Sequence, residues 1–126
     1  MKKISTTNAP AAIGPYSQGM ILGNLVFSSG QIPVDPKTGE IAGPTITEQA
    51  EQSCVNVGEV LKAAGSSLDK VVKTTCFLAD MKDFPVFNSI YEKHFVSCPA
   101  RSCVAAKELP KGVLCEIEAI AYLEEE

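Results

Sequence analysis

A helical period of apolar residues marks the segment from residue 45 to residue 65. The spacing of Thr45 and Glu48 is that of a capping box, so the helix is expected to begin near Thr45 or Thr47. Gly65 supplies a C-terminal stop, because glycine readily takes the left-handed backbone that ends many helices. The apolar positions that step by three and four, and that should face the core, are Ile46, Ala50, Cys54, Val57, Leu61 and Ala64.

A second helix is predicted after Asp83, which is expected to cap it, with Pro85 in its first turn. Pro99 follows this segment and prevents the helix from continuing. The core-facing stripe of this helix is made of Phe84, Phe87, Tyr91 and Phe95.

Four segments read as β-strands because they are rich in β-branched residues or alternate between two kinds of side chain. They are residues 25–29, 71–79, 100–106 and 113–123. The order is strands, helix, strand, helix, strands, without internal repeat or linker, which is typical of an α+β fold. A chain of 126 residues then forms one domain, residues 1–126.

The last strand has apolar residues on both of its sides toward its far end. One side carries Ala119 and Ala121, and the other carries Ile120 and Tyr122. Neither side therefore resembles a fully solvated surface. Burial of one sheet face between subunits would account for this pattern.

Charge and composition exclude several classes of protein. The formal net charge is −4, so a general affinity for nucleic acid is not expected. Lys2 and Lys3 are not followed by the apolar stretch of a signal peptide, and no apolar run is long enough to span a membrane, so a cytoplasmic location is expected. Five cysteines without a C-x-x-C pair, together with one histidine, give no zinc signature, and reduced thiols are the expectation.

Arg101 and Glu116 are the candidate chemical groups on the last two strands. Alternation places Arg101 and Cys103 on one face of their strand, with Ser102 on the other, and it places Glu116 and Glu118 on a common face. If the two strands pair, an arginine that binds a carboxylate and a glutamate that handles a proton could face one cavity. Spacing alone favours a structural ion pair between them.

Other candidate groups carry weaker signals. Tyr16 lies on a tight loop, and Gly30 ends a strand where its backbone could meet a ligand, but ordinary turn chemistry explains both. Neither loop has the spacing of a phosphate-binding motif. Cys103 could be a nucleophile, yet His94 is the only possible base and lies on a helix flank, which disfavours a Cys–His hydrolase.

Several motifs together resemble the RidA family of imine deaminases. The N-terminal motifs are residues 8–19 and residues 28–39. The C-terminal signature comprises residues 99–104, Leu109-Pro110 and residues 115–121. The resemblance runs nearly from end to end without a large insertion.

This resemblance implies a chorismate-mutase-like fold, with a mixed sheet and two helices on one face, assembled as a homotrimer with active sites in clefts between subunits. It implies hydrolysis of 2-aminoacrylate/2-iminopropanoate and 2-iminobutanoate to 2-oxo acids and ammonia, which protects pyridoxal-phosphate enzymes. No cofactor or metal is implied. An endoribonuclease or translation inhibitor, or a non-enzymatic binder of small keto acids, is the alternative.

The resemblance also implies roles for particular residues. Arg101 would bind the substrate carboxylate, with help from the backbone at Cys103, and Glu116 would position the attacking water and take its proton. The substrate-binding set would be completed by the backbone of Gly30 at the imine nitrogen, with Ser29, Tyr16 and Asn88 around it.

Overall fold

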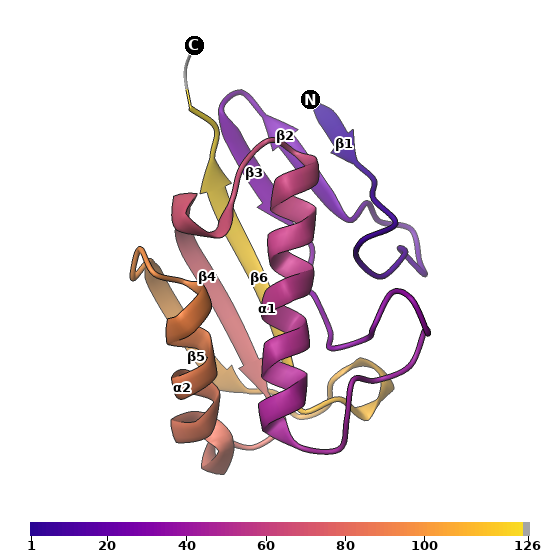
Figure 1. Ribbon diagram of the computed structural model, residues 1–126, viewed down its shortest axis with the longest axis vertical. Helices are drawn as coiled ribbons and strands as arrows, with labels where there is room; N and C mark the ends of the chain where they lie inside the picture. Colours follow the sequence, from indigo (N-terminus) through magenta and orange to yellow (C-terminus); the bar gives the residue numbers. More distant parts are fainter. Residues whose placement is uncertain (125–126) are drawn as a thin grey trace.

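A computed structural model describes residues 1–124 as one six-stranded sheet with two α-helices on one of its faces (Figure 1). The strand order is β1-β2-β3-β6-β4-β5. The expected α+β fold, with a mixed sheet and both helices on one side, is confirmed. The elements are β1 (Lys2–Ile4), β2 (Gly19–Leu22), β3 (Leu25–Ser28), α1 (Ile46–Ala63), β4 (Val71–Leu78), α2 (Phe84–His94), β5 (Ala100–Ala105) and β6 (Cys115–Tyr122).

The topology explains why the sheet is mixed. The neighbours from β1 to β4 run antiparallel, while β5 runs parallel to β4. A parallel pair needs a crossover connection, and α2 provides it. β6 lies in the centre of the sheet, between β3 and β4 (Figure 1).

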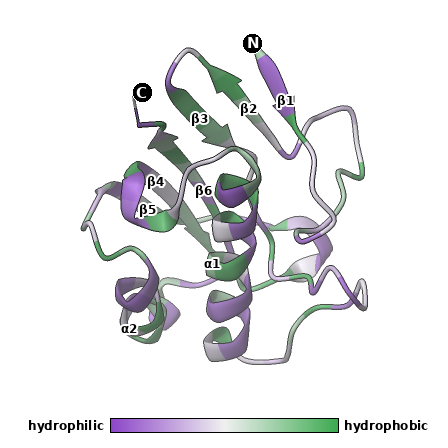
Figure 2. Ribbon diagram, turned by 45° about the horizontal axis from the view of Figure 1, so that its top comes forward, coloured by the Kyte–Doolittle hydropathy of each residue, from purple (hydrophilic) through white to green (hydrophobic). Residues whose placement is uncertain are grey.

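Two strands were not expected from the sequence. β1 is only three residues long and contains two lysines, so it carries almost no hydrophobic pattern. β2 joins β3 through the Gly23-Asn24 turn, in which Gly23 has a φ of 60°. In Figure 2, β2 and β3 are hydrophobic over most of their length, whereas β1 is hydrophilic.

Helix α1 begins and ends where expected, but without the expected capping bond. Thr45 occupies the N-cap position, yet its side chain makes no capping hydrogen bond, so the predicted capping box does not form. At the other end, Gly65 has a φ of 91° and donates to Lys62 O, and Ser66 N donates to Leu61 O at 2.9 Å. These two bonds form a Schellman motif, which needs the left-handed glycine.

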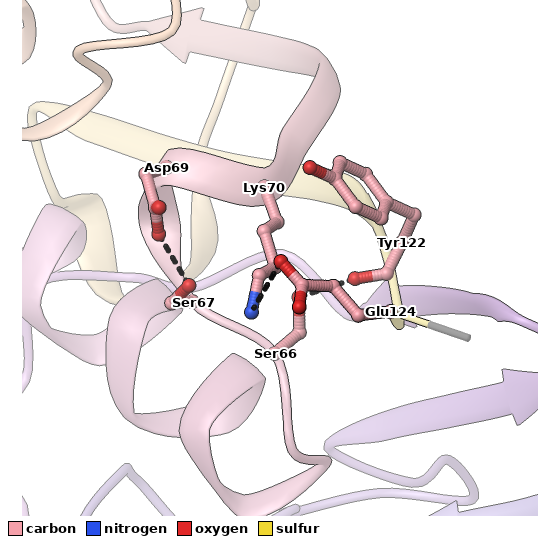
Figure 3. Close-up of polar contacts among 6 residues, drawn as sticks. All are labelled: Ser66, Ser67, Asp69, Lys70, Tyr122 and Glu124. Carbon is pink, nitrogen blue, oxygen red and sulfur yellow. Dashed lines mark hydrogen bonds and ion pairs between the residues drawn. The ribbon is translucent and has the colours of Figure 1, made fainter. Parts of the chain in front are cut away.

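The segment after α1 is tied to the end of β6 (Figure 3). The Ser66 hydroxyl donates to Tyr122 O at 2.7 Å, and Lys70 pairs with Glu124 at 3.7 Å. Ser66 is buried, and this bond satisfies its hydroxyl group. This end of the sheet is fixed by polar contacts far from the candidate site.

Helix α2 begins at Phe84 as predicted, with Asp83 at its N-cap position, but the Asp83 side chain makes no capping hydrogen bond. The capping carboxylate is that of Asp80, which accepts from Lys82 N at 2.9 Å in the short 3-10 turn preceding α2. Phe87, Tyr91 and Phe95 form the expected buried stripe, and the last two rings stack with centroids 4.4 Å apart. Phe84 remains partly exposed, and its ring lies 5.3 Å from the guanidinium carbon of Arg101.

The core lies between the sheet and the two helices. Along β6, alternate side chains are fully or nearly fully buried under the helices, as alternation predicts. Removing these side chains from water is the main source of stability for a domain of this size. The core residues of β6 are Cys115, Ile117, Ala119 and Ala121.

The opposite face of the sheet is not covered by a helix, and it is largely apolar. Its rows of paired residues include Met20–Phe27–Ile120 and Leu22–Leu25–Tyr122, together with Phe77 beside Val104. Leu22 is 56% exposed and Val104 is 48% exposed. We call this surface the open face. Exposed apolar side chains gathered on one face of a sheet are typical of an interaction surface.

Candidate active site

Arg101 lies on β5, on the helix-covered face of the sheet. It pairs with Thr74 of β4, whose side chain is fully buried beneath α2. The guanidinium donates to Asn88 Oδ1 at 2.8 Å and lies over two aromatic rings of α2, 5.3 Å from the Phe84 centroid and 4.8 Å from the Tyr91 centroid. These contacts hold the arginine in place and leave donors available, since a guanidinium has five N–H groups.

Cys103 follows Arg101 by two residues and shares its face. Its thiol is half-buried, and burial raises its pKa, although the positive charge of Arg101 acts in the opposite direction. A thiol with a raised pKa is a poor nucleophile at neutral pH. His94 is engaged elsewhere, with its Nε2 2.8 Å from Glu51 Oε2 on α1, so no Cys103–His94 pair exists.

Glu116 lies on β6 and points to the open face. It pairs with Phe77, between the buried neighbours Cys115 and Ile117. Its carboxylate packs directly on the backbone of Gly30, where an added Cβ would lie 2.8 Å from the carboxyl carbon and even closer to Oε2. Burial, and then the negative charge of Glu118, raise the pKa of Glu116. A carboxyl group tuned in this direction is suited to proton transfer.

The backbone around Gly30 leaves the sheet in a short outward loop. β3 ends at Ser28, whose hydroxyl accepts from Ala119 N at 2.9 Å. Gln31 returns to β6, donating to Ile117 O at 2.7 Å and accepting from Ile117 N at 3.2 Å. Ser29 and Gly30 therefore bulge between two fixed points, as residues often do where a strand turns toward a site.

A cavity of about 250 Å³ opens beside this bulge. Gly30 forms part of its wall, and Tyr16 lies across from it on the N-terminal loop, 49% exposed. The lining is mostly apolar, with Ile13 and Ile32 prominent, and Lys111 is its one charged residue. Such a lining with few polar groups is typical of a small-molecule site.

Arg101 and Glu116 do not meet within one chain. β5 and β6 do not pair, because β4 lies between them, and the two side chains lie on opposite faces of the sheet. The expected common cavity and the alternative of a structural ion pair are therefore both wrong for a single subunit. The confirmed part is the alternation, which places Arg101 with Cys103 and Glu116 with Glu118.

The structure thus sorts the candidate residues into two groups. We call Asn88, Arg101 and Cys103 the arginine half-site. The second group, the glutamate half-site, comprises Tyr16, Ser29, Gly30 and Glu116.

Sequence reasoning missed two contributors to these half-sites. Phe84, expected only as a core residue, supports the Arg101 guanidinium with its ring. Lys111, expected only as part of a loop, lines the cavity and has a left-handed backbone with a φ of 58°. A non-glycine residue in this conformation is uncommon, and its signal in the sequence is limited to the proline and glycine beside it.

An α+β domain with a small, mostly apolar cavity, an arginine held by Asn88, and a glutamate with a raised pKa resembles the small-molecule enzymes more than the nucleic-acid-binding proteins. The family model described as endoribonuclease L-PSP matches residues 6–123. The chain belongs to this family, which is the family of RidA, and the resemblance of its motifs is confirmed.

Relatives and solved structures agree with this assignment. The chain is 53% identical to the 2-iminobutanoate/2-iminopropanoate deaminase of Salmonella typhimurium, over 95% of this chain and 96% of the relative. It is 50% identical to the mouse protein of the same name, over 95% and 90% of the two chains. The crystal structure of Escherichia coli TdcF with bound serine superposes with a TM-score of 0.93 at 47% identity, covering 98% of this chain and all of the other.

Proposed function

We propose that this protein hydrolyses reactive 2-imino acids, or their enamine tautomers, to 2-oxo acids and ammonia. The substrates are 2-aminoacrylate/2-iminopropanoate and 2-iminobutanoate. One observation carries the assignment of chemistry: a half-buried carboxylate with a raised pKa packs against the backbone of a glycine that lines a small cavity. The names of relatives that are at least 50% identical over nearly the whole chain support the choice of substrate.

The site is complete only when two subunits meet, and the assembly is a homotrimer. This part of the proposal is supported by the opposite orientations of Arg101 and Glu116, which no side-chain rotation within one subunit can reconcile. It is also supported by the apolar open face, on which Leu22, Val104 and Tyr122 are 56%, 48% and 38% exposed. Burial of such a face is worth roughly 25 cal/mol per Å² of apolar surface. Closed rings of identical subunits are a common solution.

In the reaction, Arg101 of one subunit binds the substrate carboxylate through paired N–H donors, and the backbone at Cys103 adds a further contact. The side-chain oxygen of Asn88 accepts a hydrogen bond from the guanidinium and so fixes its orientation. The imine nitrogen faces the Gly30 backbone of the neighbouring subunit, with Ser29 and Tyr16 at the rim.

Glu116 handles the protons. It takes a proton from water as the oxygen attacks the C=N carbon, and it then returns the proton to the nitrogen. In the carbinolamine that forms, Glu116 moves the hydroxyl proton to the nitrogen in the same way, and ammonia leaves as the C=O bond is made. One imine and one water give one 2-oxo acid and one ammonia, so the glutamate ends as it began. A cytoplasmic location is part of this proposal, because pyridoxal-phosphate enzymes release such imines there.

The test is a coupled assay in which a threonine dehydratase generates the imine. The protein should accelerate the release of 2-oxobutanoate above the spontaneous rate. Arg101→Ala should abolish the acceleration, and Glu116→Ala should reduce it at least 10²-fold, an order of magnitude typical for loss of a general base. Light scattering should show that both variants keep the mass of a trimer.

Two other outcomes would redirect the assignment. The family description names an endoribonuclease, so RNA cleavage is measured in parallel with wild type and with Arg101→Ala from the same preparation. Cleavage that depends on Arg101, without imine hydrolysis, would replace the deaminase by a ribonuclease. Binding of 2-oxobutanoate without acceleration would indicate a keto-acid-binding protein.

A further inference from the structure

Gln18 has a buried side chain at the base of the N-terminal loop, and both the oxygen and the nitrogen of its amide make hydrogen bonds. It is only 5% exposed. Its Oε1 accepts from Thr6 N at 2.7 Å, and its Nε2 donates to Pro10 O at 2.8 Å, to Thr6 O at 3.0 Å and, at 3.3 Å, to Ala9 O. The amide therefore holds both the beginning and the middle of the loop between β1 and β2.

The backbone of the same residue holds the opposite wall of the cavity. Gln18 O accepts from Ser29 N at 2.9 Å, and the Ser29 hydroxyl donates to Ser17 O at 2.5 Å. Ser29 is the neighbour of Gly30, on which the Glu116 carboxylate rests. Through one residue, the N-terminal loop is joined to the bulge that supports the glutamate.

These bonds matter because few other contacts anchor the loop, chiefly the burial of Ala9 and the bond from the Ser29 hydroxyl to Ser17 O. Residues 6–17 lie outside the helices and strands, so no backbone ladder orders them. Tyr16 lies in this segment, 49% exposed, and its hydroxyl accepts only a long bond, 3.4 Å, from Ile13 N. The place of Tyr16 relative to Gly30 therefore depends on the bonds that Gln18 makes, together with the bond from the Ser29 hydroxyl to Ser17 O.

We propose that Gln18 is a positioning residue, which holds the Tyr16 wall and the Ser29–Gly30 bulge at the spacing that the chemistry on Glu116 requires. This inference rests on the proposed function. Gln18 itself does not touch the reacting atoms, because its amide is occupied by the loop. It acts on the glutamate half-site alone and leaves the arginine half-site, where the carboxylate binds, unchanged.

The experiment compares Gln18→Met with wild type and with Ser66→Ala. Methionine keeps the length of the side chain but can neither donate to the loop carbonyls nor accept from Thr6 N. Ser66→Ala is the matched control, since it removes a buried hydrogen bond at the far end of the sheet (Figure 3). Only folded trimer, isolated by size, is assayed.

For Gln18→Met we expect kcat to fall about 10- to 100-fold, as for an ångström-scale misplacement of a catalytic group. KM should change less than about threefold, because Arg101 still binds the carboxylate. The titration of the Glu116 carboxyl, followed by carbon NMR, should move to lower pH as water enters beside it. Ser66→Ala should match wild type in kcat and in this titration.

Wild-type kcat and an unchanged Glu116 titration in Gln18→Met would overturn the proposal. Gln18→Glu, which retains the acceptor but replaces the donor, is the second variant if the first does not fold. Failure of both to fold would assign Gln18 a structural role only. If wild type does not hydrolyse imines, the proposed function fails, whereas a shifted titration without any activity would still show that Gln18 positions the Glu116 environment.

Discussion

Gly30→Ala is the sharpest probe of the glutamate half-site. The added methyl group would lie 2.8 Å from the carboxyl carbon of Glu116, where ordinary contact begins near 3.4 Å, so this carbon must retreat by about 0.6 Å and Oε2 by more. The backbone at Gly30 is not in the left-handed region, so alanine meets no strain there. The Glu116 side chain is only partly buried and can move aside, so the free energy of unfolding should fall by less than about 1 kcal/mol.

The same displacement should be costly for catalysis. A shift of about 1 Å in a reacting group can reduce the rate about 10²-fold, and we expect kcat in the coupled dehydratase assay to fall by 10- to 100-fold. KM should stay close to the wild-type value, because the carboxylate of the substrate is bound at Arg101 and not at Glu116. Activity within twofold of wild type would refute the reasoning that Glu116 must rest on Gly30.

A double variant separates this steric effect from general damage. In a Glu116→Ala background the methyl group of Gly30→Ala meets no carboxylate, so it should cause little additional loss of activity or stability. The two changes are then strongly non-additive, as expected for residues in contact. Equal losses in both backgrounds would show that Gly30 acts independently of Glu116.

Three further predictions concern single residues. Arg101→Lys keeps the charge but loses the planar guanidinium and its contact with Asn88, so KM should rise about 10- to 100-fold in the coupled assay. An unchanged KM would contradict binding of the substrate carboxylate by Arg101. Burial raises the pKa of Glu116 in the folded state, so protonation of this carboxyl group favours folding. The resulting stabilisation is fully present below the pKa of the unfolded state, and it is lost as the pH rises through the pKa of the folded state. Glu116→Gln, which removes this effect, should therefore melt above wild type at pH 7 to 8 but not near pH 4, as measured by thermal unfolding at each pH; an equal difference at all pH values would exclude the linkage. Lys111→Gly relieves a left-handed φ of 58° and should raise the free energy of urea unfolding by about 0.5 to 1 kcal/mol, whereas a loss would show that the Lys111 side chain stabilises the loop.

The elements with strong periodicity were predictable from the sequence, and those without it were not. Helix α1 follows from its apolar spacing and its Gly65 stop, and the central strands β4 and β6 follow from alternation. β1 was missed because three edge residues carry no pattern. Thr45 and Asp83 occupy the predicted N-cap positions, but neither side chain makes the capping bond, which depends on local backbone geometry as well as on residue type.

The candidate residues could be named from motifs, but their arrangement could not. Alternation along a strand fixes which residues share a face, so Arg101 with Cys103 was predictable. The order of strands across the sheet is a tertiary property, and only the structure shows that β4 separates Arg101 from Glu116. The close fit of Gly30 against Glu116 likewise joins segments 86 positions apart, for which the sequence contains no local signal.

The central claim is that Arg101 and Glu116 act from different subunits, and mixing two inactive variants tests it directly. Arg101→Ala and Glu116→Ala are each purified, unfolded together in equal amounts and refolded. Each site then needs an intact arginine half-site from one subunit and an intact glutamate half-site from its neighbour. Random assembly of a ring makes about a quarter of the sites complete, since each half is intact with a chance of about one half.

If the site is shared between subunits, the mixture should recover about a quarter of the wild-type rate per site in the coupled dehydratase assay. The two variants refolded separately and then combined without unfolding serve as the control and should remain inactive. A mixture as inactive as its parents, with trimer of normal mass, would contradict a site shared between subunits.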